Sequence, residues 1–305
     1  MNIGDVIKII RELLNLTQQE LALKLGVQYE LINRWENNKV VPENRNINMI
    51  YSFAFDNKIY INNIYEQFYK EENTDENNVV LFHGAKEKIS TKIDLNHPKK
   101  QNDFGIGFYL GESFYQAATY ISYSKSNTIY SYVLNTCNLK IIKFDVDLRW
   151  MLAIAYYRGW IDEFKEHEII KEIISEVESS DVVIAPIADN KMFDLIDEFV
   201  SGMTTDEQCK HALSATNLGF QYVIKTNKGL DQLNFLDEMF LCEKERNNYL
   251  SKRLESNKIG LDKVKIARIE YKNKGKYIGE ILKWKNLIIT NIQSAECKEK
   301  YLKNH

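Results

Sequence analysis

The segment 16–37 constrains the fold of this chain more than any other part of it. Thr17 is followed three residues later by Glu20, which is the pattern of a capping box at the start of a helix. Apolar residues at helical spacing lie on both sides of Gly26, which ends the first helix and permits a tight turn. The segment therefore predicts two short helices that are joined by a tight turn and bury one face each.

The letters LTQQELALKLGV and INRWENN, followed by Pro42, resemble the Cro/repressor-type (XRE) helix-turn-helix over roughly residues 5–60. The resemblance implies that the second helix enters the major groove of DNA. The residues that it assigns to DNA contacts are Gln18, Gln28, Tyr29, Asn33, Arg34 and Lys39. Residues 1–45 hold six basic and six acidic side chains, so few phosphate contacts are expected. The alternative is a helical module for dimerisation or partner docking.

Length and composition indicate a globular chain of more than one domain. The 305 residues predict about two domains, and 44% of them are hydrophobic, enough for a real core. No apolar run is long enough for a membrane span, and the first residues lack a signal pattern. The four Cys are scattered without a CxxC pair, and no spacing of His, Cys, Asp and Glu indicates a metal. We therefore expect a cytoplasmic protein without a metal site.

The order of patterns along the chain predicts an α+β fold in several parts. We expect a helical domain over 1–68, a linker over 69–78, a mixed domain over 79–240 and a basic extension over 241–305. Segments rich in β-branched and aromatic residues predict strands. These are Val79–Phe82, Thr128–Leu134, Leu139–Phe144, Val182–Ile187 and Phe220–Thr226.

Helical spacing is found between these strands and after them. It predicts helices over Leu148–Glu178 and Asn190–Val200, and another that Thr204 caps with Glu207. Beyond residue 243 the chain reads as a charged helix, followed by short strands over 264–269 and 287–290. Residues 243–305 carry 16 Lys and Arg against 8 Asp and Glu, which indicates either a polyanion contact or a solvated lysine-rich surface.

The central part of the chain combines features of a pocket for a flat ring. His83 and Gly84 end a strand, and together they offer an imidazole beside an unhindered backbone amide. Gly107 in the segment DFGIGFYL, like the glycine two residues before it, allows a ligand to approach the backbone closely. Tyr109 and Tyr120 lie eleven residues apart, one on a strand and one on the next helix. Two such rings could sandwich a flat heterocycle.

These motifs in this order resemble the nicotinamide pocket of ADP-ribosyltransferases of the diphtheria-toxin and poly(ADP-ribose) polymerase class. They resemble more closely a bacterial domain family of unknown function that is related to those enzymes. The matching segments are His83-Gly84, Asp103–Tyr109, Asp181–Asp189 and Gln221-Tyr222-Val223. The likeness covers about residues 79–236 and implies a split β-sheet fold that binds NAD.

The resemblance also implies a role for each matching residue. The backbone of Gly84 would hold the nicotinamide carboxamide and His83 the adjacent ribose, while Tyr109 and Tyr120 would stack on the ring. Gly107 would lie against the cofactor. Nicotinamide would then leave through an oxocarbenium-like transition state, with His83, Tyr109 and Gln221 as the catalytic residues.

Gln221 stands where the related enzymes normally have a glutamate. A Gln side chain donates and accepts hydrogen bonds, but it carries no charge and cannot act as a base. This departure favours a single ADP-ribose transfer, or NAD hydrolysis, over chain elongation. It leaves open a base from elsewhere in the chain, for which the sequence offers Asp103, Glu112, Asp181 and Asp189.

The sequence leads to three hypotheses on function. The first is a mono-ADP-ribosyltransferase that modifies a protein or nucleic-acid acceptor, as a toxin or phage-defence effector. The second is a transcription regulator that senses NAD without turning it over. The third is an NAD glycohydrolase. The partners expected are NAD and the acceptor, DNA at the helix-turn-helix, an antitoxin or regulator protein, and a second copy of the chain.

Overall fold

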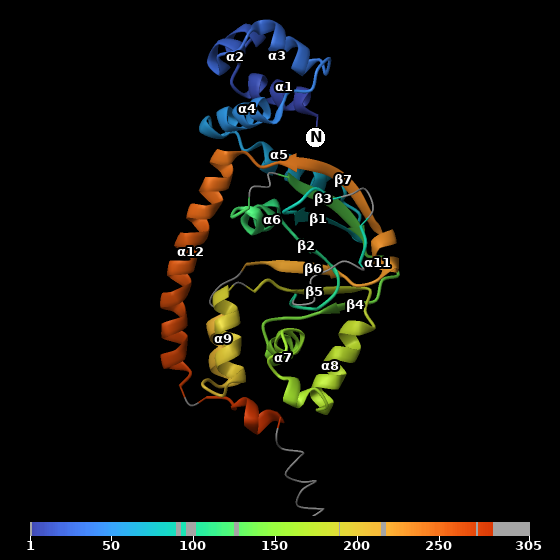
Figure 1. Cartoon of the computed structure of the whole chain (residues 1–305), viewed down its shortest axis with the longest axis vertical. Coiled ribbons are helices and arrows are strands. Elements are labelled where there is room, and N and C mark those ends of the chain that lie inside the picture. Colours follow the sequence, from blue (N-terminus) through green and yellow to red (C-terminus); the bar gives the residue numbers. More distant parts are fainter. Residues whose placement is uncertain are drawn as a thin grey trace, which may run out of the picture. The chain divides into compact units, whose positions relative to one another are not determined.

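The computed structural model describes residues 2–89, 93–95, 102–124, 128–188, 190–214, 218–272 and 274–282. The chain divides into two compact units (Figure 1). Unit 1 comprises residues 1–95, 108–139 and 219–257, and unit 2 comprises residues 96–107, 140–218 and 258–305. Each unit contains both helices and strands. The expectation of an α+β chain is therefore confirmed.

Five helices begin unit 1. They are α1 (Ile3–Leu13), α2 (Gln18–Leu25), α3 (Tyr29–Glu36), α4 (Asn44–Asp56) and α5 (Ile61–Glu72). The predicted capping box is present, because the Glu20 N–H donates to Thr17 Oγ1 and the Thr17 N–H donates to Glu20 Oε2. Gly26 ends α2 with a φ of 67°, a left-handed conformation that favours glycine.

A partly buried ion pair joins α1 to the end of α3. The Arg11 guanidinium donates to both carboxylate oxygens of Glu36 at 2.6 and 2.8 Å, and also to the carbonyl of Leu16 at 2.9 Å. The hydrogen bond to Glu36 raises the pKa of Arg11. Arg11 is thus engaged inside the helical domain, where it stabilises the packing of α1 against α3.

The sheet of unit 1 is antiparallel throughout. Its strands follow the order β6 (Phe220–Ile224), β2 (Phe108–Gly111), β1 (Asn78–Gly84), β3 (Thr128–Asn135) and β7 (Leu233–Phe240). Helix α6 (Phe114–Ile121) packs against β1, β2 and β3. Phe114 of α6 lies edge-on against Phe82 of β1, with ring centroids 6.4 Å apart. The predicted strands over 79–82, 128–134 and 220–226 are therefore present.

Helix α5 joins the helical domain to the sheet. It extends to Glu72, so that four residues of the segment predicted as a linker are helical. Tyr69 packs into the core beside the sheet, and its hydroxyl donates to Asp237 Oδ2 on β7 at 2.7 Å. Residues 73–77 then connect α5 to β1.

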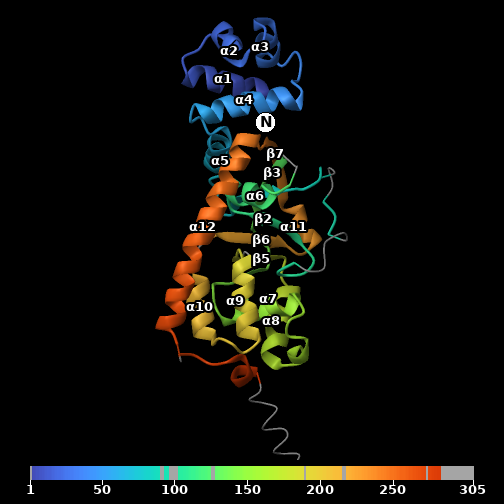
Figure 2. The same ribbon diagram turned by 60° about the vertical axis from the view of Figure 1, so that its left-hand side comes forward.

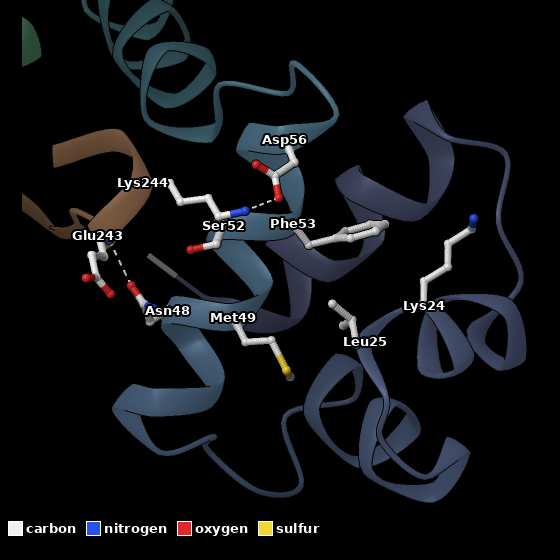
Figure 3. A pocket seen from close by; sticks show the side chains of 9 residues that line it. All are labelled: Lys24, Leu25, Asn48, Met49, Ser52, Phe53, Asp56, Glu243 and Lys244. Atoms are coloured by element: carbon white, nitrogen blue, oxygen red, sulfur yellow. Dashed lines mark hydrogen bonds and ion pairs between the residues drawn. The ribbon is translucent and has the colours of Figure 1, made fainter. Parts of the chain in front are cut away.

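The helical domain also contacts α12 (Glu243–Glu270), whose first turn lies on α4 (Figure 3). Lys244 forms an ion pair with Asp56, and the Glu243 N–H donates to Asn48 Oδ1 at 2.9 Å. These contacts form one wall of a pocket of about 370 Å³, whose other wall includes Leu25 of α2. None of the residues that line the pocket is predicted to bind NAD. The pocket lies where the helical domain contacts the first turn of α12.

Unit 2 contains the parallel pair β4 (Ile141–Lys143) and β5 (Val182–Pro186). Its helices include α7 (Leu148–Tyr157), α8 (Glu168–Glu178), α9 (Asn190–Val200) and α10 (Asp206–Ser214), with the 3-10 turn η1 (Asp162–Phe164) between α7 and α8. The expected continuous helix over 148–178 is thus interrupted after Tyr157, where Gly159 adopts a φ of 74°. The cap of α10 is Thr205 and not Thr204, because the Gln208 N–H donates to Thr205 Oγ1.

Other expectations about secondary structure are corrected or lie outside the described residues. The predicted strand over 264–269 is wrong, because these residues are helical and belong to α12 (Figure 2). The helix α11 (Asn227–Asp231) and the strand β7 were not predicted. The predicted strand over 287–290 lies outside the described residues. Among the described helices, none has the length and apolar character needed to cross a bilayer.

Candidate active site

The imidazole of His83 is fixed at the end of β1. Its Nδ1 lies 2.6 Å from the carbonyl oxygen of Tyr109 on β2, and its ring stacks on Phe108 with centroids 4.5 Å apart. A carbonyl oxygen only accepts hydrogen bonds, so Nδ1 must carry the proton of this bond. Burial lowers the pKa of His83, which favours the neutral ring. In that tautomer Nε2 is an acceptor, suited to a hydroxyl group of a ligand.

Gly84 follows His83 and is closely covered by α6. A Cβ atom at this position would collide with the carbonyl oxygen of Ala117 and would lie 2.8 Å from Ile121 Cγ2. The packing of α6 on β1 therefore explains the glycine without any ligand. The predicted contact between this backbone and a carboxamide stays a prediction.

We expect Gly84→Ala to destabilise unit 1 by about 1–3 kcal/mol, the usual cost of inserting a methyl group into a well-packed core. The new Cβ would force α6 away from β1, because one of the atoms that it meets is a backbone carbonyl. Urea unfolding followed by circular dichroism measures the change. An unchanged unfolding midpoint would show that α6 does not pack on Gly84 in solution.

The ladder between β2 and β6 brings two of the predicted residues together. Gly111 pairs with Gln221, and Tyr109 pairs with Val223. Since paired residues and residues two apart share a face, Tyr109 and Gln221 point to the same side of this ladder. Gln221 is buried and Tyr109 is half-buried. The sequence motifs from two distant segments therefore meet on adjacent strands.

The structure places His83 differently from Tyr109 and Gln221. Phe82 pairs with Gly111, so alternation along β1 directs His83 to the opposite face of the sheet. The imidazole of His83 is hydrogen-bonded to the backbone carbonyl of Tyr109 and not to its phenol ring. The three predicted catalytic residues thus lie on three neighbouring strands, but their side chains do not converge from one face.

Tyr120 lies in the last turn of α6, and 61% of its surface is exposed. The Lys86 ammonium lies over its ring, 5.4 Å from the centroid. A flat ligand could stack on this face of Tyr120 only after Lys86 moves. Gly107 immediately precedes β2, two residues before Tyr109. The expected sandwich of two tyrosine rings around a ligand remains a prediction.

The sequence leaves four acidic residues as candidates for the base, and the structure distinguishes among them. Asp103 forms an ion pair with Arg158 at 2.7 Å, and Asp181 Oδ2 accepts the Lys140 N–H at 2.8 Å. Both contacts hold unit 2 together. Asp189 lies outside the described residues. Glu112 directly follows β2 and accepts the Phe220 N–H at 3.1 Å, beside Gln221.

The predicted DNA-contacting residues lie on or beside α2 and α3. Gln28, Tyr29, Arg34 and Lys39 are exposed. The Asn33 amide donates to Gln18 Oε1 at 3.1 Å, which ties α3 to the start of α2. Asn33 and Gln18 therefore stabilise the turn between the helices, and their predicted contacts with DNA are not tested by this geometry.

No cluster of three His, Cys, Asp or Glu side chains that could hold a metal ion is found among the described residues. Tyr222, next to Gln221, has a raised pKa because of burial and the charge of Glu112. The described part of the site therefore offers an imidazole, tyrosine rings, an amide and one nearby carboxylate.

Comparison with known proteins gives two matches. Residues 79–235 match the family described as protein of unknown function (DUF3990), and residues 7–48 match the helix-turn-helix family. The second match confirms a helix-turn-helix DNA-binding domain at the N-terminus. Neither a curated protein nor a solved structure matches this chain.

Proposed function

We propose, from the premise that this chain belongs to the DUF3990 family, that residues 79–240 bind NAD and transfer its ADP-ribose group to an acceptor. The observation that carries the proposal is the bond between His83 Nδ1 and the Tyr109 carbonyl. It links the two motifs that resemble an ADP-ribosyltransferase, and it leaves Nε2 of a neutral imidazole as an acceptor for a ribose hydroxyl.

The proposed reaction breaks the bond between nicotinamide and C1′ of its ribose. The electron pair leaves with nicotinamide, and C1′ develops positive charge in an oxocarbenium-like transition state. Groups held in place before the reaction stabilise such charge best. His83 is held by Tyr109 and Phe108, and Gln221 is held on β6, so each is fixed before the reaction. Because their side chains lie on opposite faces of the sheet, the proposal requires the bound NAD to reach both faces. The helix-turn-helix would bring this activity to DNA or regulate its synthesis, as in a toxin or phage-defence effector.

Tyr120→Ala tests the stacking part of this proposal. The side chain is 61% exposed, so its removal should leave the fold intact. Loss of one aromatic stacking contact should weaken the binding free energy of NAD by about 0.5–1.5 kcal/mol, which is a fall in affinity of about 2- to 12-fold. Isothermal titration calorimetry measures the binding, and release of nicotinamide measures the cleavage.

Tyr123→Ala is the matched control for Tyr120→Ala. Tyr123 is equally exposed, at 64%, and it also lies under a cation, because Arg253 is 5.0 Å from its ring centroid. Its removal should leave NAD binding unchanged. NAD labelled in its adenylate portion then identifies the acceptor in a lysate treated with protease or nuclease. Equal losses of affinity in both variants, or no nicotinamide release by the wild type, would contradict the proposal.

A second function, an NAD-sensing regulator, is supported by the uncharged Gln221 and by the direct packing of the helical domain on the sheet. Asn62 of α5 donates to the carbonyl of Phe240 on β7 at 2.9 Å, so ligand binding at the sheet could reach the DNA-binding helices. In this case NAD would change the affinity for operator DNA without being consumed. A gel-shift titration with NAD, combined with an assay for free nicotinamide, separates the two functions.

A further inference from the structure

Glu112 occupies an unusual place at the end of β2. The ladder of β2 and β6 ends with the pair Gly111 and Gln221, and the next N–H of β6 donates to the Glu112 side chain. Oε1 accepts this hydrogen bond from Phe220 at 3.1 Å. The carboxylate of Glu112 thus takes the place of a backbone acceptor, one residue from Gln221.

Two glycines make room for side chains at this point. A Cβ on Gly219 would lie 2.5 Å from Glu112 Oε1, and a Cβ on Gly111 would lie 2.6 Å from Gln116 Oε1. Gln116 is held at the start of α6 by a reciprocal capping box with Ser113. Since Gly111 is the cross-strand partner of Gln221, the polar groups of Gln116 and Glu112 border the position of Gln221.

Glu112 also retains hydrogen-bonding capacity. Among the residues that the structure describes, its one hydrogen bond is that from Phe220 to Oε1, so Oε2 accepts no hydrogen bond from them. The side chain is half-buried. Asp103 and Asp181, by contrast, are engaged by Arg158 and by the Lys140 N–H.

We propose that Glu112 is the general base of the site, with Oε2 taking the proton of the acceptor while Gln221 binds the ribose. This inference rests on the proposed ADP-ribosyl transfer. As the bond from C1′ to nicotinamide breaks, its electron pair leaves with neutral nicotinamide. The acceptor oxygen or nitrogen forms the new bond to C1′ and loses its proton to Glu112. The carboxylate then supplies the charge that Gln221 lacks.

Glu112→Gln separates this role from a structural one. Gln keeps an oxygen that can accept the Phe220 N–H, but it cannot take a proton. We expect kcat for nicotinamide release to fall about 100-fold with an unchanged Kd for NAD, since general bases contribute roughly 10²- to 10⁴-fold. Exogenous formate should restore part of the activity of Glu112→Ala, because it supplies a carboxylate at the vacated position.

Glu238→Gln is the charge-matched control. Glu238 is exposed on β7 of the same sheet, and its neutralisation should leave kcat unchanged. If the wild type releases nicotinamide and Glu112→Gln releases it equally fast, Glu112 is a structural clamp and the inference is overturned. If the wild type binds no NAD by calorimetry or releases no nicotinamide, the proposed function fails, and the assignment of Glu112 fails with it.

Discussion

Replacement of His83 by alanine is expected to lower the rate of NAD cleavage by about 100-fold or more. The imidazole is held before any ligand binds, by the Tyr109 carbonyl at 2.6 Å and by the Phe108 ring. Removing one such preorganised group from an active site typically costs 10²- to 10³-fold in kcat. Release of nicotinamide under saturating NAD measures the change, and thermal unfolding shows whether the variant is folded.

His83→Asn distinguishes the two nitrogens of the ring. An asparagine amide can still donate to the Tyr109 carbonyl in place of Nδ1, but it offers nothing at the position of Nε2. We therefore expect His83→Asn to be as inactive as His83→Ala while unfolding at a higher temperature. Full activity in His83→Asn would mean that the imidazole serves only to join β1 to β2.

The same histidine predicts how cleavage depends on pH. Burial lowers the pKa of His83, so the ring is neutral at pH 7 and gains a proton only in more acidic solution. A protonated ring has no acceptor at Nε2, so the contribution of His83 is lost as pH falls through its pKa. The affinity of the wild type for NAD should fall in the same range, and that of His83→Ala should not.

Local patterns predicted much of the fold. The capping box of Thr17 and Glu20 and the turn at Gly26 depend on residues a few positions apart, so the sequence alone specifies them. Strand β7 was not predicted because Asn, Asp and Glu interrupt its apolar residues. The strand forms because it pairs with β3, a contact that its own sequence does not reveal. The residues 264–269 are rich in β-branched side chains, yet they continue α12.

The candidate site was predictable in its parts but not in its assembly. The motifs around His83 and Tyr109 identified two adjacent strands, and their hydrogen bond joins them. Nothing in the sequence reveals that Gln221 pairs with Gly111, because this contact joins segments 110 residues apart. The choice of Glu112 among four acidic residues depends on the same pairing. The pattern Ser-x-x-Gln at 113–116 is a capping box that could have been noticed.

Glu245→Gln is expected to stabilise the protein at pH 8 by up to about 3 kcal/mol. Glu245 is 4% exposed, and burial raises its pKa to about 7, although hydrogen bonds from Asn62 and Tyr249 oppose the shift. A shift from 4.5 to about 7 corresponds to about 3 kcal/mol. The contribution of Glu245 to stability is full below pH 4.5 and is lost as pH rises through 7.

Urea unfolding at pH 5 and pH 8 tests this assignment. At pH 5 the folded protein holds Glu245 protonated, so Gln should change the stability little. At pH 8 the wild type must keep the charged carboxylate of Glu245 buried between α5 and α12, where Asn62 donates to it at 2.7 Å. The Gln variant buries no charge there, so it should be the more stable protein at this pH. Glu243→Gln, an exposed change in the same turn of α12, should have no effect at either pH. Equal stability of Glu245→Gln and the wild type at pH 8 would show that water reaches the carboxylate, and hence that the helical domain does not stay packed on α12 in solution.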